Sequence, residues 1–155
     1  MPNTKELFQT ALQLFHEKED FIFAVIIESS GSAPRKAGAK MLIRSNGTIC
    51  GTVGGGSIEY TAIKDALHAF ESQKSFTKQY DLSNRHAAEL GMICGGTVTI
   101  QFQYVSHQDT TLYQYFQEES LKQSNRVYIF GGGHVAQELV PILNRLEFSC
   151  IVFDD

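Results

Sequence analysis

The chain has 155 residues, of which 43% are hydrophobic and 19% charged, which is typical of a globular protein that can bury a core. Its net charge of -4 at pH 7 excludes a globally basic surface for nucleic acid. No apolar run reaches the roughly 20 residues of a membrane span, and the N-terminal residues lack a signal-peptide core. We therefore expect a cytoplasmic protein with no nucleic-acid partner and no membrane span.

The first part of the chain alternates helix and strand patterns. Apolar residues at helical spacing predict a helix over residues 4–16, and the continuous apolar run at residues 21–29 predicts a buried strand. Residues 30–38 contain two glycines, two serines and a proline, and this composition predicts a loop. Residues 39–53 are typical of a β-hairpin, in which Asn46-Gly47 predicts a type I′ turn.

A glycine turn at residues 54–56 leads into a second predicted helix. This helix covers residues 57–73, and Ser57 is a good N-cap for it. Residues 75–83 favour a strand. The segment 91–105 begins with glycines and ends as a strand in which apolar and polar residues alternate.

These patterns divide the chain into three parts. Residues 1–106 predict an α/β domain with a mixed sheet, and the more polar residues 107–125 predict a connecting helix with its linkers. Residues 126–155 then read as strand, glycine turn, helix and strand, which is the first βαβ unit of a Rossmann-like domain. Because one such unit cannot cover both faces of a parallel sheet, we expect this domain to be truncated.

The second glycine turn carries a dinucleotide-type fingerprint. Gly131, Gly133 and Ala136 fit G-x-G-x-x-G/A, and Asp154 follows where a ribose-binding acid would lie. The glycines permit a tight turn and the close approach of a pyrophosphate, whereas Ala136 permits close packing of helix on strand. The alternative is that only this geometry persists and no dinucleotide binds.

The earlier glycine cluster, Gly54 to Gly56 followed by Ser57, matches no nucleotide motif. Its amides stand at a predicted helix N-terminus, where the helix dipole would favour an anion. Glu59 stabilises the start of the helix, but an acid beside an anion is unexpected unless it faces a donor on the ligand. The alternative is a capped helix without a ligand.

Two further features flank this cluster in the sequence. Arg35 lies in the preceding loop and could bind a phosphate or the polar edge of a pterin, unless it is an ordinary solvated charge. Cys94 stands directly before Gly95 and Gly96, whose amides would favour a thiolate; the alternative is a buried cysteine. The three cysteines are odd in number and lack CxxC spacing, which argues against a disulfide framework.

Together, the stretches GSAPRKAGAKMLI, GTVGGGSIEY, GMICGG and IFGGGHVAQEL resemble the XdhC/CoxI family, the accessory proteins that mature xanthine dehydrogenase and related molybdenum hydroxylases. The motifs occur in the family's order and cover nearly the whole chain. The resemblance implies an N-terminal α/β domain followed by a Rossmann-like domain. It also implies a chaperone, rather than a catalyst, that binds molybdenum cofactor, supports its sulfuration and inserts it into the apo-enzyme.

The resemblance and the fingerprint together imply a set of cofactor-binding residues. They are Arg35, Gly54, Gly55, Gly56, Ser57, Glu59, Cys94, Gly95, Gly96, Gly131, Gly133, His134 and Asp154. Some members of the family carry a cysteine at the position of Ser57, so in this chain a thiol that touches the metal would be Cys94.

The implied partners are apo xanthine dehydrogenase, or a related molybdenum hydroxylase, and a cysteine desulfurase. A homodimer is also expected, because a truncated sheet exposes an edge that another copy could cover. Two other functions stay open. One is an NAD(P)-dependent oxidoreductase that uses the turn Gly131 to Ala136, and the other is a scaffold in which the glycines serve packing only.

Overall fold

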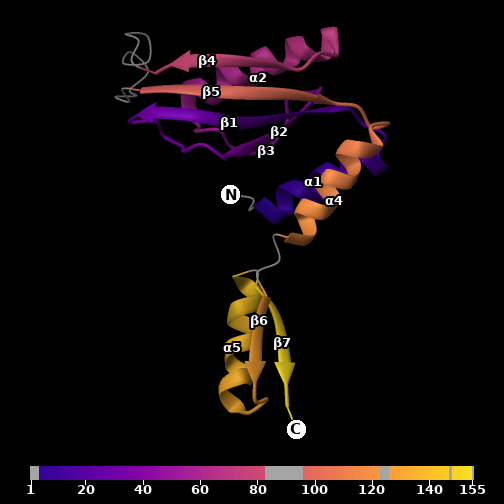
Figure 1. Cartoon of the computed structure of the whole chain (residues 1–155), viewed down its shortest axis with the longest axis vertical. Coiled ribbons are helices and arrows are strands. Elements are labelled where there is room, and N and C mark those ends of the chain that lie inside the picture. Colours follow the sequence, from indigo (N-terminus) through magenta and orange to yellow (C-terminus); the bar gives the residue numbers. More distant parts are fainter. Residues whose placement is uncertain (1–3, 83–95, 123–125, 147, 155) are drawn as a thin grey trace.

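The computed structural model describes residues 4–82, 96–122, 126–146 and 148–154. Figure 1 shows an N-terminal part, built from a sheet with helices on both faces, and a smaller C-terminal part of two strands and one helix. The N-terminal elements are α1 Thr4–His16, β1 Phe21–Gly31, β2 Lys40–Arg44, β3 Ile49–Gly51, α2 Gly56–Ser72, β4 Phe76–Asp81, β5 Gly96–Val105 and α4 Thr110–Lys122.

The N-terminal sheet has the strand order β3-β2-β1-β5-β4. The predicted α/β class is confirmed, but the prediction of a mixed sheet is wrong for this part, because all four neighbouring pairs of described strands are antiparallel. The physical reason is the path of the crossover. Helix α2 connects β3 to β4, and these two strands lie at opposite edges of the sheet, so the helix joins no adjacent parallel pair.

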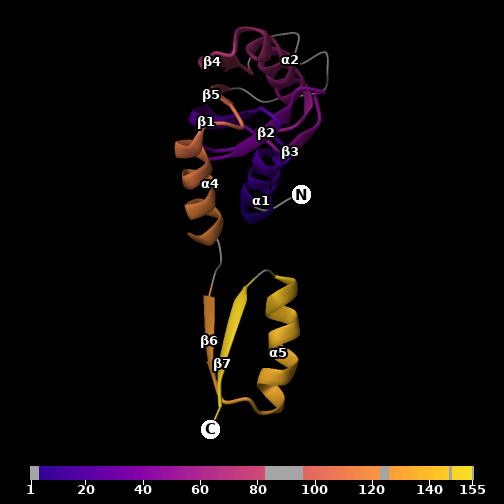
Figure 2. The same ribbon diagram turned by 90° about the vertical axis from the view of Figure 1, so that its right-hand side faces the viewer.

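Each face of this sheet buries a hydrophobic core. On one face α2 packs against alternate residues of the central strands, among them Ile22, Ala24 and Ile100. On the other face α1 and α4 lie side by side, as both Figure 1 and Figure 2 show. That second core is rich in aromatic rings; its phenylalanines are Phe8, Phe15, Phe21, Phe23 and Phe116.

Helix α4 belongs to this second core as well as lying between the two parts of the chain. Phe116 of α4 is fully buried and its ring lies 5.1 Å from that of Phe23 in an edge-on contact. The same ring lies 6.0 Å from that of Phe8 on α1. The polar segment predicted as a connection therefore also packs on the N-terminal fold, and the domain boundaries stay predictions.

The hairpin between β2 and β3 is confirmed, but its turn is not type I′. Only Gly47 has a positive φ, of 82°, whereas a type I′ turn needs two such residues. Arg44 N–H donates to the Thr48 carbonyl at 2.9 Å, which leaves a three-residue loop. Asn46 Oδ1 accepts a hydrogen bond from Thr48 N–H at 2.9 Å, so this asparagine stabilises the loop through its side chain.

A β-bulge interrupts the pairing of β1 with β5. Ile26 pairs with Ile100 and Glu28 pairs with Thr99, so Ile27 is an extra residue on β1. Glu28 thereby lies on the face opposite α2, where its carboxylate accepts a hydrogen bond from the Thr99 hydroxyl at 3.4 Å. The bulge keeps this carboxylate out of the core beneath α2.

The C-terminal part consists of β6 Arg126–Phe130, α5 His134–Arg145 and β7 Ser149–Phe153. The two strands pair in parallel, which agrees with the predicted βαβ unit. The predicted assignment of this unit to a Rossmann-like domain stays a prediction. The sheet bears exposed aromatic side chains, including Phe130, whose ring stacks on that of Phe153 at 5.3 Å.

A hydrogen-bonded network joins the start of β1 to the end of β5. The Asp20 carboxylate accepts hydrogen bonds from the Tyr104 hydroxyl at 2.5 Å, from the His107 backbone N–H at 2.8 Å and from His107 Nδ1 at 2.6 Å. Burial by itself would raise the pKa of Asp20, but these hydrogen bonds outweigh it and lower the pKa below the ordinary value of 3.8. Burial and the Asp20 contact raise the pKa of Tyr104 to about 12.

The Asp20 network makes the stability depend on pH in acid. Because the pKa of Asp20 is lower in the folded state, its stabilising contribution is complete above pH 3.8 and is lost as the pH falls through the folded-state pKa. We expect Asp20→Asn to lower the free energy of unfolding by about 1 kcal/mol at pH 7, since the carboxylate is only partly buried. Urea unfolding of both proteins from pH 7 to pH 3 should show the difference shrinking in acid. A difference that grows in acid would contradict the assignment.

Candidate functional site

The loops that carry the sequence motifs gather at one edge of the N-terminal sheet. Antiparallel pairing places the last residue of β1, Gly31, opposite the first residue of β5, Gly96. The same pairing rule brings the ends of β3 and β4 and the start of β2 to this edge. Figure 1 shows the arrowheads of β1 and β4 on the side where β5 begins. We call residues 31–39, 51–57 and 96 the glycine edge.

Two of the motifs are in direct contact at the glycine edge. A Cβ atom at Gly54 would lie 3.0 Å from Pro34 Cγ and 3.2 Å from Ile58 Cγ2, so the glycine turn packs against the loop before β2. Arg35, which is exposed, follows Pro34 in that loop. Gly54 also has a φ of +144°, which side chains rarely adopt. The structure thus places the loop that carries the predicted cation against the predicted glycine turn.

The third motif reaches the same edge through Gly96. A Cβ atom there would lie 2.3 Å from the Ser30 carbonyl oxygen and 3.2 Å from the Ser32 nitrogen. The Gly96 carbonyl accepts a hydrogen bond from Leu82 N–H at 2.8 Å. Gly96 therefore fits between the ends of β1 and β4 because it has no side chain. Cys94 and Gly95, which precede it, lie outside the described residues.

The glycine turn at the start of α2 is held by Thr52 and Glu59. The Thr52 hydroxyl donates to Glu59 Oε2 and accepts a hydrogen bond from Gly54 N–H at 3.1 Å. Gly55 N–H also donates to Glu59 Oε2, at 3.3 Å. The acid that was unexpected beside an anion therefore faces donors of its own chain.

The predicted N-cap of α2 is wrong by two residues. The N-cap is Gly55, with a φ of 74°, and it makes no side-chain capping hydrogen bond. Ser57 lies within the first turn of the helix instead. Glu59 supplies what the capping residue lacks, because its carboxylate reaches back to the Gly55 amide and favours the positive end of the helix dipole.

The second glycine turn joins β6 to α5 and brings its predicted acid close. Gly131 has a φ of +103°, and its N–H donates to the Phe153 carbonyl at 2.7 Å. A Cβ atom at Gly132 would lie 2.3 Å from Asp154 Oδ2, so this carboxylate lies directly on the turn. Ala136 is buried, as its predicted packing role requires, and His134 is exposed.

The two glycine turns do not form one site. In Figure 1 and Figure 2 the β6–α5 connection lies at the end of the molecule opposite the glycine edge. The predicted binding residues therefore fall into two groups. One group contains Arg35, Gly54, Gly55, Gly56, Ser57, Glu59 and Gly96, and the other contains Gly131, Gly133, His134 and Asp154.

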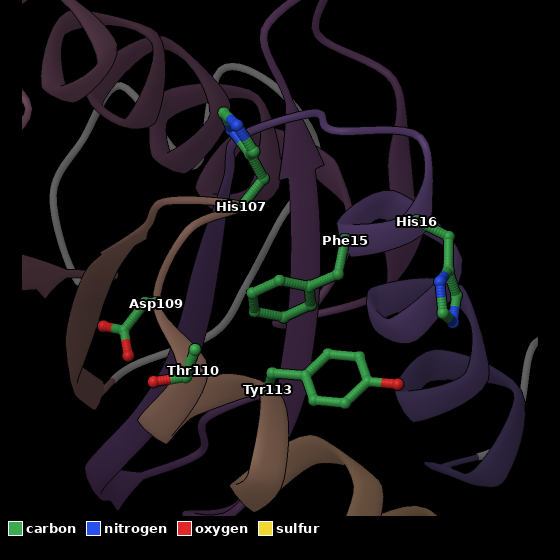
Figure 3. Close-up of a pocket in the computed structure, with 6 residues that line it drawn as sticks. All are labelled: Phe15, His16, His107, Asp109, Thr110 and Tyr113. Atoms are coloured by element: carbon green, nitrogen blue, oxygen red, sulfur yellow. The ribbon is translucent and has the colours of Figure 1, made fainter.

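A separate pocket of about 230 Å³ lies between α1 and the start of α4. Figure 3 shows the Tyr113 ring near Phe15 and His16, whose rings it contacts. The His107 ring points away from Tyr113. Two polar side chains of this pocket, His107 and Asp109, are engaged within the fold. His107 contacts Asp20, and Asp109 Oδ1 accepts hydrogen bonds from two backbone N–H groups in the first turn of α4, at 3.0 and 2.9 Å.

Sequence reasoning missed the pairing of Asp20 with His107. The two residues are 87 positions apart and belong to no motif, so only the fold brings them together. Among the described residues, no group of three or more His, Cys, Asp or Glu side chains could hold a metal ion. In the same part of the chain, no helix is both long and apolar enough to cross a membrane.

Comparison with known proteins bears directly on the glycine-rich motifs. Residues 14–81 match the family model described as the XdhC and CoxI family, and this segment includes the Arg35 loop and the first glycine turn. The resemblance to the XdhC and CoxI family is confirmed. The match ends before Cys94 and before the second glycine turn.

Three curated relatives extend the comparison. The chain is 28% identical to "Uncharacterized protein YqeB" of Escherichia coli (strain K12) over 148 residues, which are 96% of this chain and 24% of the relative. It is 26% identical to "Molybdenum cofactor insertion chaperone PaoD" of the same organism, over 62% of this chain and 30% of the relative. It is 27% identical to a protein of Bacillus subtilis (strain 168) named as a probable xanthine dehydrogenase subunit, over 69% of this chain and 33% of the relative.

The chain thus spans at most about a third of the length of these curated relatives. A solved structure described as a xanthine dehydrogenase from Bacillus halodurans superposes on it with a TM-score of 0.69. That alignment covers 94% of this chain and 61% of the other, at 20% identity. At this identity the likeness establishes the shared fold.

The crowding around Gly96 predicts the effect of adding a methyl group there. We expect Gly96→Ala to lower the free energy of unfolding by about 1–3 kcal/mol, because the backbone of Ser30 must move to admit the Cβ atom. Gln101→Ala, an exposed change on the same strand, should stay within about 0.5 kcal/mol of the unchanged protein. Urea unfolding measures both. Equal stability of the two variants would contradict the close packing of β5 on the end of β1.

Proposed function

We propose that the chain is part of an accessory protein that binds molybdenum cofactor, supports its sulfuration and inserts it into xanthine dehydrogenase or a related molybdenum hydroxylase. The match of residues 14–81 to the XdhC and CoxI family supports this proposal. Further support comes from relatives named as a molybdenum cofactor insertion chaperone and as a probable xanthine dehydrogenase subunit. On this proposal the chain is a cofactor carrier and leaves hydroxylation to its client.

The observation that carries the proposal is the meeting of three motifs at the glycine edge. Pro34 packs on Gly54, and Gly96 packs on the backbone of Ser30 and Ser32. A cofactor at this edge would meet the Arg35 guanidinium, which suits a phosphate, and the Cα surface of the glycine turn, which admits a flat ring. Cys94, two residues before Gly96, would offer a soft sulfur ligand for molybdenum.

The partners of such a carrier follow from its task. An apo molybdenum hydroxylase would receive the cofactor, and a cysteine desulfurase would supply sulfur to it. We also propose a cytoplasmic homodimer, since β3 and β4 each pair with one neighbour only among the described strands and leave sheet edges open.

Cofactor retention by single-residue variants tests this function. The full chain is loaded with molybdenum cofactor under reducing, anaerobic conditions, and the pterin retained after gel filtration is measured by fluorescence after oxidation. We expect Arg35→Ala and Cys94→Ser each to retain at least about tenfold less pterin than the unchanged chain. Arg35→Ala removes a charged contact to the phosphate, and Cys94→Ser removes a soft sulfur ligand for molybdenum. Arg145→Ala and Cys150→Ser are the matched controls and should retain as much as the unchanged chain. Unchanged retention in both test variants would overturn the assignment.

A second candidate function is favoured by one observation in the C-terminal part. The Asp154 carboxylate lies on Gly132, which is where a Rossmann-type turn brings its ribose-binding acid close to the glycines. The parallel strands β6 and β7 and the buried Ala136 have the geometry that the fingerprint requires. This candidate is an NAD(P)-dependent oxidoreductase, with His134 as its nearest general acid.

Titration with NADH separates the two candidates. A Cβ atom at Gly133 would meet nothing within 4 Å, so Gly133→Ala should fold normally while its methyl group obstructs a pyrophosphate. For a cofactor carrier we expect no saturable change in NADH fluorescence. A saturable change that Gly133→Ala and Asp154→Asn both abolish would favour the oxidoreductase.

A further inference from the structure

The side chain of Glu59 decides which kind of ligand group the glycine turn can accept. Its Oε2 atom takes a hydrogen bond from the Thr52 hydroxyl and another from Gly55 N–H, at 3.3 Å. Gly54 N–H is used as well, because it donates to Thr52 Oγ1 at 3.1 Å. Two backbone amides of the glycine turn, those of Gly54 and Gly55, are therefore engaged within the turn.

The Glu59 carboxylate also changes the electrostatics of this helix start. It places a negative charge at the N-terminal end of α2, where the helix dipole would otherwise attract an anion. A phosphate at the glycine turn would meet this like charge at close range. The glycine turn is thus unsuited to the anionic end of a ligand.

The second oxygen of the same carboxylate is the group left for a ligand. Both hydrogen bonds to Glu59 end on Oε2, and no donor in the described part of the chain contacts Oε1. Glu59 is half-buried, and the two bonds on Oε2 fix its orientation. A carboxylate oxygen held in this way accepts N–H donors strongly, because the bond is charge-assisted.

We infer that Glu59 accepts a hydrogen bond from the N–H-bearing edge of a ligand heterocycle at the glycine edge, and that Thr52 is the residue that positions it. This inference rests on the proposed function, in which the ligand is molybdenum cofactor. The matching group of that cofactor is the aminopyrimidinone edge of its pterin, which carries N–H donors. The phosphate of the cofactor then lies toward the loop of Arg35 and Lys36, away from the carboxylate.

Separate probes for the two ends of the cofactor test this orientation. Unsubstituted pterin and inorganic phosphate are each titrated into the full chain, with pterin fluorescence and calorimetry as readouts. Glu59→Gln is compared with Glu71→Gln, which removes an exposed carboxylate from the far end of the same helix. We expect Glu59→Gln to weaken pterin binding at least about tenfold without changing phosphate binding, because the neutral amide forfeits the charge-assisted bond. Glu71→Gln should change neither.

Pterin binding that Glu59→Gln leaves unchanged would overturn the inference. If phosphate binding also increased in that variant, Glu59 would only block an anion site. Retention of the whole cofactor distinguishes this failure from failure of the proposed function. If the unchanged chain and the Glu59→Gln variant retain the cofactor equally well, only the role of Glu59 is refuted. If the unchanged chain retains no cofactor, both the proposed function and the role of Glu59 are refuted.

The positioning role of Thr52 has its own test. Thr52→Val keeps the shape but loses the hydroxyl that contacts Glu59, so pterin binding should weaken, whereas Thr52→Ser should keep it. In the Glu59→Gln background Thr52→Val should have little further effect, because the two residues act as one unit. Thermal unfolding of each variant shows that the fold is intact. Fully additive losses would mean that Thr52 does not act through Glu59.

Discussion

The antiparallel pairing of β1 with β5 is the interaction on which the N-terminal part depends. It runs from Phe21 opposite Val105 to Gly31 opposite Gly96 and forms the centre of the sheet. One end of this pair brings Asp20 to Tyr104 and His107, and the other end brings Gly96 to the loop that carries Arg35. A single strand pair thus fixes both the network that ties the sheet to α4 and the edge at which the sequence motifs meet.

Much of the local structure could be predicted from the sequence, because apolar spacing is a local property. The helix predicted over residues 4–16 is α1 with the same bounds. The strand predicted over residues 21–29 corresponds to β1, and the strand predicted at the start of residues 126–155 corresponds to β6. The errors concern features that depend on distant contacts or on single dihedral angles. The mixed sheet failed because strand order follows non-local pairing, and the turn at Asn46 failed because the loop adds a third residue with only Gly47 at positive φ.

In the candidate site, too, the sequence indicated which residues matter but not the contacts that they make. The resemblance to the XdhC and CoxI family pointed to Gly54, Glu59 and Arg35. It could not show that Pro34 packs on Gly54 or that Glu59 faces Thr52 and Gly55. The Pro34 contact depends on how two loops meet in the fold, and the Glu59 contacts depend on one side-chain conformation at the start of α2. Asp20 and His107 had no signal at all, because their pairing joins residues from opposite ends of the N-terminal part.

The bulge at Ile27 gives β1 a property that its composition does not reveal. Side chains alternate between the two faces of a strand, so one extra residue exchanges the faces of every residue after it. Ile22, Ala24 and Ile26 lie against α2, whereas Glu28, two positions further on, lies on the opposite face. If the same residues paired with β5 as a regular strand, the Glu28 carboxylate would point into the core. If Ile27 were deleted, β1 could pair with β5 as a regular strand, and Glu28 would still lie on the face opposite α2. Deletion of Ile27 would therefore leave every other residue of β1 on its present face of the sheet.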